Sequence, residues 1–129
     1  EYAAGFFDGE GCVHLGQRRN YMWMQSITIS NTNLSILQAF QERWGGAISK
    51  HMPNGRNCKP IHQWVLKNKG GEAFLREILP HLIVKRYNAE IYLSFRATIP
   101  SKHERVSADT YHIRSILVGL SHKANHRGL

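Results

Sequence analysis

Two pairs of short segments alternate apolar and polar residues, as strands do when one face of a sheet is buried. The first pair spans residues 12–19 and 23–29, with an Arg-Arg-Asn sequence at the tip between its strands. The second pair spans residues 47–52 and 61–67, with a Pro-Asn-Gly turn after its first strand. The alternation therefore predicts two β-hairpins.

In the segments between and after these hairpins, apolar residues recur every three or four positions, which is the spacing of a helix with one buried face. The first of these helices is predicted at residues 34–44, after N-cap candidates at residues 31–33 and before a Gly-Gly stop. Others are predicted at residues 74–79, after Gly70 and Gly71 and before a proline, at residues 87–97, and from about residue 109. With a helix at the N-terminus, this order indicates one α+β domain covering residues 1–129.

Residues 2–11 combine small residues, two phenylalanines and two carboxylates within about three helical turns. In a helix, Gly5 and Gly9 share one face with Ala4 beside them, and small residues at this spacing let two helix backbones approach closely. Glu10 ends the helix, where the partial negative charge of the terminus disfavours a carboxylate. A bound metal ion would offset that repulsion, but the same run of residues also fits a plain core helix.

The composition favours a polyanionic partner. Lys and Arg outnumber Asp and Glu by 17 to 9, which gives a net charge of +8 and a pI near 9.9. Such an excess on a small domain is typical of nucleic-acid binding, although a generically basic protein would share it. No apolar run is long enough to span a membrane, and no signal-peptide pattern is evident. Two cysteines, Cys12 and Cys58, are too few for a disulfide framework and favour a reducing, intracellular compartment.

The N-terminal stretch resembles the motif that names the LAGLIDADG homing endonucleases. Ala4-Gly5 matches the first Ala-Gly of that motif, Phe6-Phe7 its central apolar pair, and Asp8-Gly9-Glu10-Gly11 its acidic end. The order of predicted elements is also the family's, so the resemblance covers nearly the whole chain. It implies an αββαββα fold whose antiparallel sheet forms a DNA-binding saddle.

The resemblance further implies a homodimer, because the family's active site needs two motif helices side by side. Residues 116–120 bear a faint likeness to the motif, but Ser-His-Lys follows where acids belong, so the chain carries one copy. The dimer interface is accordingly predicted at Ala4, Gly5, Asp8 and Gly9.

By the same resemblance, Glu10 binds the catalytic divalent cation, Mg²⁺ or another such as Mn²⁺, with the Gly9 carbonyl as a further ligand. Each of two Glu10 carboxylates would serve one strand of a long, near-palindromic DNA site, and a metal-activated water would cut it to leave a short staggered break. Asp8 is a second ligand candidate. The alternative for Asp8 is a solvated or hydrogen-bonded acid.

Two more catalytic candidates follow from position in the family pattern. Lys85 matches a basic residue near the scissile phosphate, where a cation stabilises developing charge; its alternative is an ordinary surface lysine at the start of a helix. Asn31 stands where the family often has a polar, water-ordering residue, commonly Gln, and it could equally cap the following helix.

DNA contacts are predicted on the sheet face that the core residues leave free, because a two-stranded unit can enter a major groove. The predicted base-contacting residues are His14, Arg18, Asn20, Met24, Ser26, Thr28, Lys50, Gln63 and Val65. Phosphate contacts are predicted for Arg19, Arg56 and Lys59. For each of them alone, a solvated strand residue is the alternative.

The leading prediction is therefore a Mg²⁺-dependent, site-specific DNA endonuclease that serves a mobile intron or intein. Such an enzyme would act in an organelle, either a chloroplast or a mitochondrion, or in a prokaryotic or phage-infected cytoplasm. The alternative is a non-cleaving relative, either an RNA splicing maturase or a DNA-binding regulator. His122 and His126 have metal-binding spacing but no third ligand, and are predicted to lie in a basic, partly frayed tail.

Overall fold

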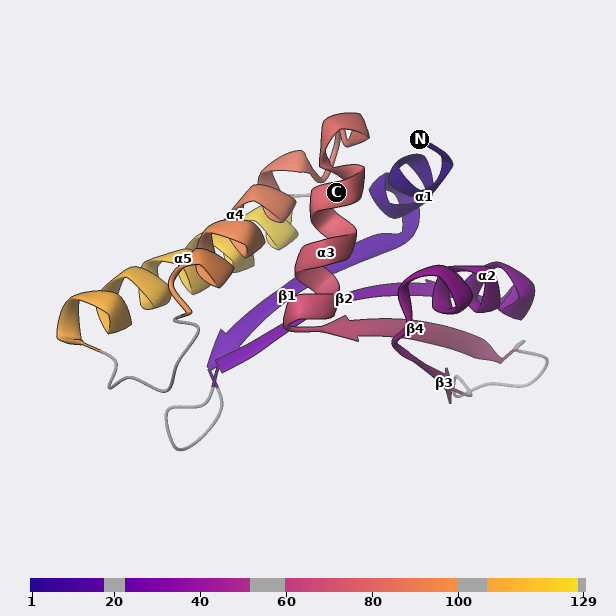
Figure 1. Cartoon of the computed structure of the whole chain (residues 1–129), viewed down its shortest axis with the longest axis horizontal. Coiled ribbons are helices and arrows are strands. Elements are labelled where there is room, and N and C mark those ends of the chain that lie inside the picture. The colour runs from indigo at the N-terminus through magenta and orange to yellow at the C-terminus, as the bar shows by residue number, and fades with distance from the viewer. Residues whose placement is uncertain (18–22, 52–59, 100–106, 128–129) are drawn as a thin grey trace.

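The computed structural model describes residues 1–17, 23–51, 60–99 and 107–127. Its elements follow the predicted order, with two hairpins separated by one helix and followed by several (Figure 1). They are α1 (Tyr2–Glu10), β1 (Gly11–Gln17), β2 (Trp23–Asn31), α2 (Leu34–Trp44), β3 (Ala47–His51), β4 (Ile61–Lys67), α3 (Lys69–Ile78), the 3-10 turn η1 (Leu79–His81), α4 (Arg86–Ala97) and α5 (Ala108–Arg127).

The four strands form one antiparallel sheet in the order β1-β2-β4-β3. The two hairpins therefore join through β2 and β4, and the N-terminal strand of each hairpin lies at an outer edge. Figure 1 shows the described helices gathered on one side of this sheet, the upper side in that view. The predicted α+β class and the two hairpins are confirmed.

The core lies between the sheet and the helices. Val13, Ile27 and Trp64 point into it from three strands and are fully buried, as the alternation in the sequence predicts. They meet an aromatic cluster in which Phe74 makes edge-to-face contacts with Phe7 and with Trp64. Each such buried side chain contributes about 1.5–3 kcal/mol, so the core fixes which sheet face stays free.

Two glycines that were predicted to precede α3 lie inside that helix, so this prediction is wrong. Gly70 and Gly71 belong to its first turn. A Cβ atom on Gly71 would stand 2.5 Å from the Tyr92 hydroxyl, which donates a hydrogen bond to the Asn68 carbonyl. The absence of a side chain at Gly71 therefore lets α3 approach α4 closely, and that packing outweighs the low helix propensity of glycine.

The helix predicted from about residue 109 is α5, 20 residues long, which lies along the unpaired edge of β1; it includes residues 122–126, so the prediction of a partly frayed tail there is wrong. Asn125 donates its side-chain amide to the Val13 carbonyl at 2.8 Å, and His122 Nε2 donates to the Leu15 carbonyl at 2.9 Å. These bonds satisfy carbonyls that an edge strand would otherwise leave open. His122 thus has a structural role, and the side chain of His126 lies outside the described residues.

None of the described helices combines the length and the apolar character that crossing a lipid bilayer requires.

Candidate nucleic-acid interface and active site

The sheet has one face that no described helix covers, the lower face in Figure 1. Because strand residues alternate between faces, its side chains are those out of phase with the buried core residues. They are Cys12, His14 and Gly16 from β1, Met24, Ser26, Thr28 and Ser30 from β2, Ile61, Gln63, Val65 and Lys67 from β4, and Ala47, Ser49 and His51 from β3. We call this set the open sheet face.

The open sheet face includes six of the residues predicted to contact DNA, but their access to solvent differs. His14, Met24, Gln63 and Val65 are half-buried, whereas Ser26 and Thr28 keep only 7% and 8% of their surface. Both belong to β2, an interior strand flanked on each side. A ligand on this face would therefore contact the more exposed side chains around Ser26 and Thr28 before it reached these two residues.

His14 and Thr28 form a pair across the first hairpin, with His14 Nε2 3.1 Å from Thr28 Oγ1. Burial lowers the pKa of His14 below its usual range, so its ring is neutral at neutral pH. A neutral imidazole offers one donor and one acceptor, which suits contact with a base edge better than contact with a phosphate.

The prediction that Lys50 shares this face is wrong. Lys50 pairs with His62, whereas Gln63 pairs with Ser49, so Lys50 has the opposite phase to Gln63 and Val65. The side chain of Lys50 is exposed because β3 is an edge strand.

Three residues of the open sheet face were not among the predicted DNA contacts, namely Ser49, His51 and Lys67. Trp64 and Leu66 are buried on the same strand as Lys67, so the alternation along β4 could have identified Lys67 as a residue of the opposite face. No such signal exists in β3, where four of the five residues are exposed. The remaining predicted contacts, Arg18, Arg19, Asn20, Arg56 and Lys59, lie outside the described residues.

Glu10 ends α1 with an exposed side chain, and no described residue forms a hydrogen bond or ion pair with its carboxylate. Gly9 beside it is exposed as well. The described residues contain no group of three His, Cys, Asp or Glu side chains able to hold a metal ion. One free carboxylate nevertheless fits Mg²⁺, which commonly binds one or two protein carboxylates and fills its other positions with water and phosphate oxygens.

Lys85 reaches the same end of α1 from a segment 75 residues further along the chain. Its Nζ lies 3.3 Å from the Asp8 carbonyl oxygen, one of the carbonyls that the end of a helix leaves without an intrahelical partner. The ammonium group thus offsets the negative end of the helix that carries Glu10. The structure therefore brings the predicted catalytic residues Glu10 and Lys85 to one helix terminus.

The Asp8 carboxylate is used within its own chain. Asp8 Oδ2 accepts a hydrogen bond from the Ile83 amide at 2.8 Å, and Oδ1 accepts one from the Lys85 amide at 2.9 Å. This arrangement favours the hydrogen-bonded alternative for Asp8 over a metal ligand.

Asn31 closes β2 with its side chain in a turn. Its Oδ1 accepts a hydrogen bond from the Asn33 amide at 2.8 Å, and Asn33 in turn caps α2 by accepting from the Ser35 amide. The cap residue is thus Asn33, and Asn31 shapes the turn before it.

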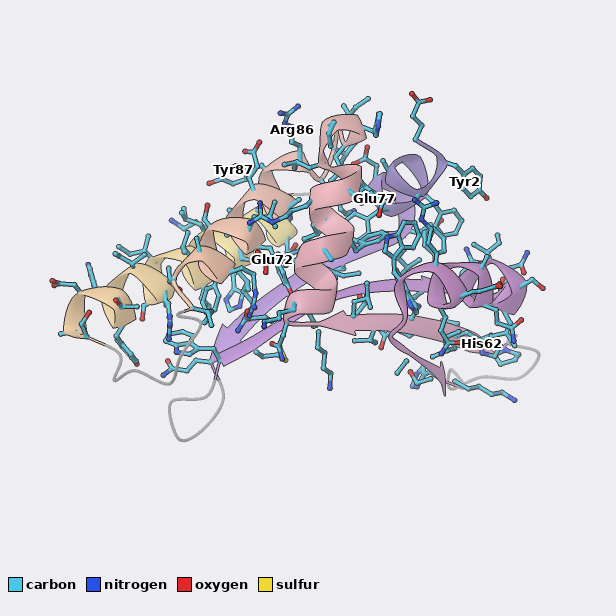
Figure 2. All side chains as sticks on the ribbon, viewed as in Figure 1. Tyr2, His62, Glu72, Glu77, Arg86 and Tyr87 are labelled. Carbon is cyan, nitrogen blue, oxygen red and sulfur yellow. The ribbon has the colours of Figure 1, made fainter. Side chains whose placement is uncertain are left out.

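The α1 residues that are predicted to form a dimer interface differ in their exposure to solvent. Ala4 is fully buried within its own chain, so its assignment to the interface is wrong. Gly5 and Gly9 are exposed, and a Cβ atom on either would meet no atom within 4 Å. Tyr2 is 72% exposed on the same helix (Figure 2), and its side chain lines a pocket between α1 and α2.

Three solved structures with this architecture are homing endonucleases. The homing endonuclease I-CvuI in complex with its target, in the presence of calcium, is 20% identical to the chain with a TM-score of 0.75, over 95% of this chain and 79% of that one. The archaeal intron-encoded homing endonuclease I-Vdi141I, complexed with DNA, is 19% identical with a TM-score of 0.73, over 95% and 81%. The homing endonuclease I-TnaI is 14% identical with a TM-score of 0.74, over 99% and 96%.

No protein-family model and no curated protein sequence matches the chain. At these identities the structural likeness establishes the fold, which is that of the LAGLIDADG homing endonucleases. The match covers nearly the full length of single-domain members such as I-TnaI.

Proposed function

We propose that this chain is a LAGLIDADG homing endonuclease that acts as a homodimer and cuts both strands of a long, near-palindromic DNA site. The observation that carries the proposal is the end of α1, where an exposed, unpaired Glu10 follows the exposed Gly5 and Gly9 and has the Lys85 ammonium near it. A structural helix terminus gains nothing from a free carboxylate at its negative end.

The exposed surface of α1 supports association of two copies. Bare backbone at Gly5 and Gly9 allows a second α1 to approach closely. Ile83 and Val84, in the segment that is hydrogen-bonded to Asp8 of α1, add apolar side chains that are 84% and 59% exposed. An isologous interface places the same residue of each subunit on either side of the two-fold axis. Two Glu10 carboxylates would then lie near that axis, one for each DNA strand.

Hydrolysis of a phosphodiester needs an attacking water, neutralisation of the phosphate and stabilisation of the leaving oxygen. A divalent cation supplies all three when it is bound by carboxylates and phosphate oxygens. Glu10 would hold such a cation, with the Gly9 carbonyl beside it. Lys85 would place its ammonium near the scissile phosphate, where it stabilises the charge that develops on the phosphoryl oxygens. Neighbours of this fold were crystallised with calcium or magnesium, which agrees with a divalent cation here.

The open sheet face would bind the duplex. It has no helical cover among the described residues, and the chain carries a net charge of +8. I-CvuI and I-Vdi141I were both crystallised with DNA, which supports the same partner for this chain. The break would serve the insertion of a mobile intron or intein, in the organelle or prokaryotic cell that harbours that element.

The test is a cleavage selection on a large pool of randomised duplex DNA in the presence of Mg²⁺. Wild-type protein should yield paired, staggered ends at one near-palindromic consensus. Glu10→Gln should cut nothing yet bind that consensus with similar affinity, because the exchange removes a charge from the cation site and leaves the sheet unaltered.

Glu42→Gln is the matched control, since it removes an exposed carboxylate from α2. It should cut like the wild type. Retained cutting by Glu10→Gln would rule out Glu10 as the cation ligand. Binding without cutting by the wild type would move the assignment to a DNA-binding regulator, and a preference for RNA would move it to a splicing maturase.

A further inference from the structure

One carboxylate joins the motif helix to the segment that carries Lys85. Asp8 lies in the last turn of α1, and its two oxygens accept the amides of Ile83 and Lys85 at 2.8 and 2.9 Å. The Lys85 ammonium returns the contact to the Asp8 carbonyl at 3.3 Å. Side chain and main chain of Asp8 therefore both bind the same short segment.

That segment has little else to hold it. Residues 82–85 lie between η1 and α4 and adopt no regular structure. Leu82 anchors one end in the core at 3% exposure, and the Lys85 carbonyl anchors the other by accepting the first hydrogen bond of α4, from Ala89. Between these points Ile83 and Val84 are exposed. The hydrogen bonds from the Ile83 and Lys85 amides to the Asp8 carboxylate thus restrain the backbone that leads up to Lys85.

The geometry points to Asp8 as a positioning residue for catalysis, which acts through Lys85. Both carboxylate oxygens are committed to amide hydrogens, so Asp8 fixes the backbone of Lys85 and through it the reach of the ammonium toward the end of α1. A carboxylate suits this task because an anion is favoured near the N-terminus of a helix, and Lys85 is the N-cap of α4. This inference rests on the proposed endonuclease function, in which Lys85 acts on the phosphate.

Asp8→Asn tests the idea with a change of one atom. An Asn side chain keeps one acceptor oxygen, but its amide group faces an N–H donor and cannot accept from it. We expect the single-turnover cleavage rate on bound DNA to fall about 10- to 100-fold, the range found when the support of a catalytic group is removed. DNA affinity, measured with Ca²⁺ in place of Mg²⁺, should stay within about twofold, because the open sheet face is unchanged.

A double variant of Asp8 and Lys85 distinguishes a positioning role of Asp8 from a general loss of structure. If Asp8 acts through Lys85, the double variant Asp8→Asn/Lys85→Met should cleave no more slowly than Lys85→Met alone. Losses that multiply would overturn the inference. Glu90→Gln is the matched control, since Glu90 is an exposed carboxylate on α4 that pairs with Arg86 of the same helix, and it should cleave at the wild-type rate.

Hydrogen exchange gives a readout that does not depend on cleavage. In Asp8→Asn the amides of Ile83 and Lys85 should exchange faster than in the wild type, while amides of β2 keep their protection. Unchanged exchange at both amides would refute the restraint itself. Faster exchange with an unaltered cleavage rate would refute the positioning role alone. Faster exchange in a protein that never cuts would refute the proposed function and, with it, any catalytic role for Asp8.

Discussion

The two hairpins of the sheet are protected in different ways. The outer edge of β1 is covered by α5, which donates side-chain hydrogen bonds to two of its carbonyls. The outer edge of β3 has no strand paired to it in the described part of the chain, and β3 is five residues long and mostly exposed. Short, charged edges resist unwanted pairing without a cover, and Lys50 lies on this one. Within the described residues, the outer strand of the first hairpin is thus covered by a helix, and the outer strand of the second is not.

This difference matters because the two hairpins have unequal tasks. The first leads directly out of α1, since β1 begins at Gly11 immediately after Glu10. Movement of that hairpin would move the proposed cation site, so its cover by α5 also steadies the chemistry. The second hairpin is farther from Glu10 in the sheet order.

The largest effect should come from removing the cover of β1. In Asn125→Leu the Val13 carbonyl loses its donor and the Asn88 side chain loses its acceptor, so two polar groups at the buried contact are left unpaired. We expect a loss of about 2 kcal/mol in the free energy of unfolding, measured by urea denaturation.

The same experiment on the other edge gives the contrast. Lys50→Gln on β3 and Lys123→Gln on the exposed side of α5 should each change the unfolding free energy by no more than about 0.5 kcal/mol. An equal loss for Lys50→Gln and Asn125→Leu would show that the edges do not differ.

A smaller effect is expected on DNA binding from Lys67, the exposed cation at the end of the open sheet face. Lys67→Ala should weaken binding to all duplexes alike and reduce the slope of log affinity against log salt by about 0.9, the value for one lost phosphate contact. Lys50→Ala, on the opposite face of β3, should leave that slope nearly unchanged. Filter binding at several salt concentrations distinguishes the two, and identical slopes would contradict the assignment of faces.

The smallest effect concerns pH. Because burial lowers the pKa of His14, the folded protein takes up that proton less readily than the unfolded chain, whose histidines titrate near 6.5. The folded state is therefore destabilised as the pH falls below about 6.5, and unaffected by this group above it. His14→Gln keeps a polar partner for Thr28 and should flatten the loss of stability between pH 7 and 5. Superimposable pH profiles for both proteins would rule out a contribution from His14.

The sequence predicted those parts of the fold whose pattern reports directly on burial. Val13, Leu15, Ile27 and Ile29 alternate cleanly, and the first hairpin is as expected. In β3 only Ile48 is partly buried, and a strand with so little contrast does not reveal its phase, so Lys50 was placed on the wrong face. Gly70 and Gly71 were misread as a boundary, because the close approach that requires glycine at position 71 is to Tyr92, a residue of another helix.

The sequence predicted the residues of the candidate site, but not the hydrogen bonds that link them. Glu10 follows from the motif, and Lys85 from the resemblance. The two hydrogen bonds that the Asp8 carboxylate accepts from the segment before α4 join residues 75 and 77 positions apart, and no local pattern encodes them. Ala4 was assigned to the wrong surface because the spacing of small residues identifies a helix stripe without saying which side of it the core occupies.

The cover of β1 by α5 also limits how copies of this chain could polymerise through their sheets. A fibre grows only if each unit offers two reactive ends, in the way that a polymer needs bifunctional monomers. Within the described residues the sheet offers one, the outer edge of β3, since the other is capped by the protein's own side chains. Two copies that joined at β3 would form a closed pair, and the reaction would end there.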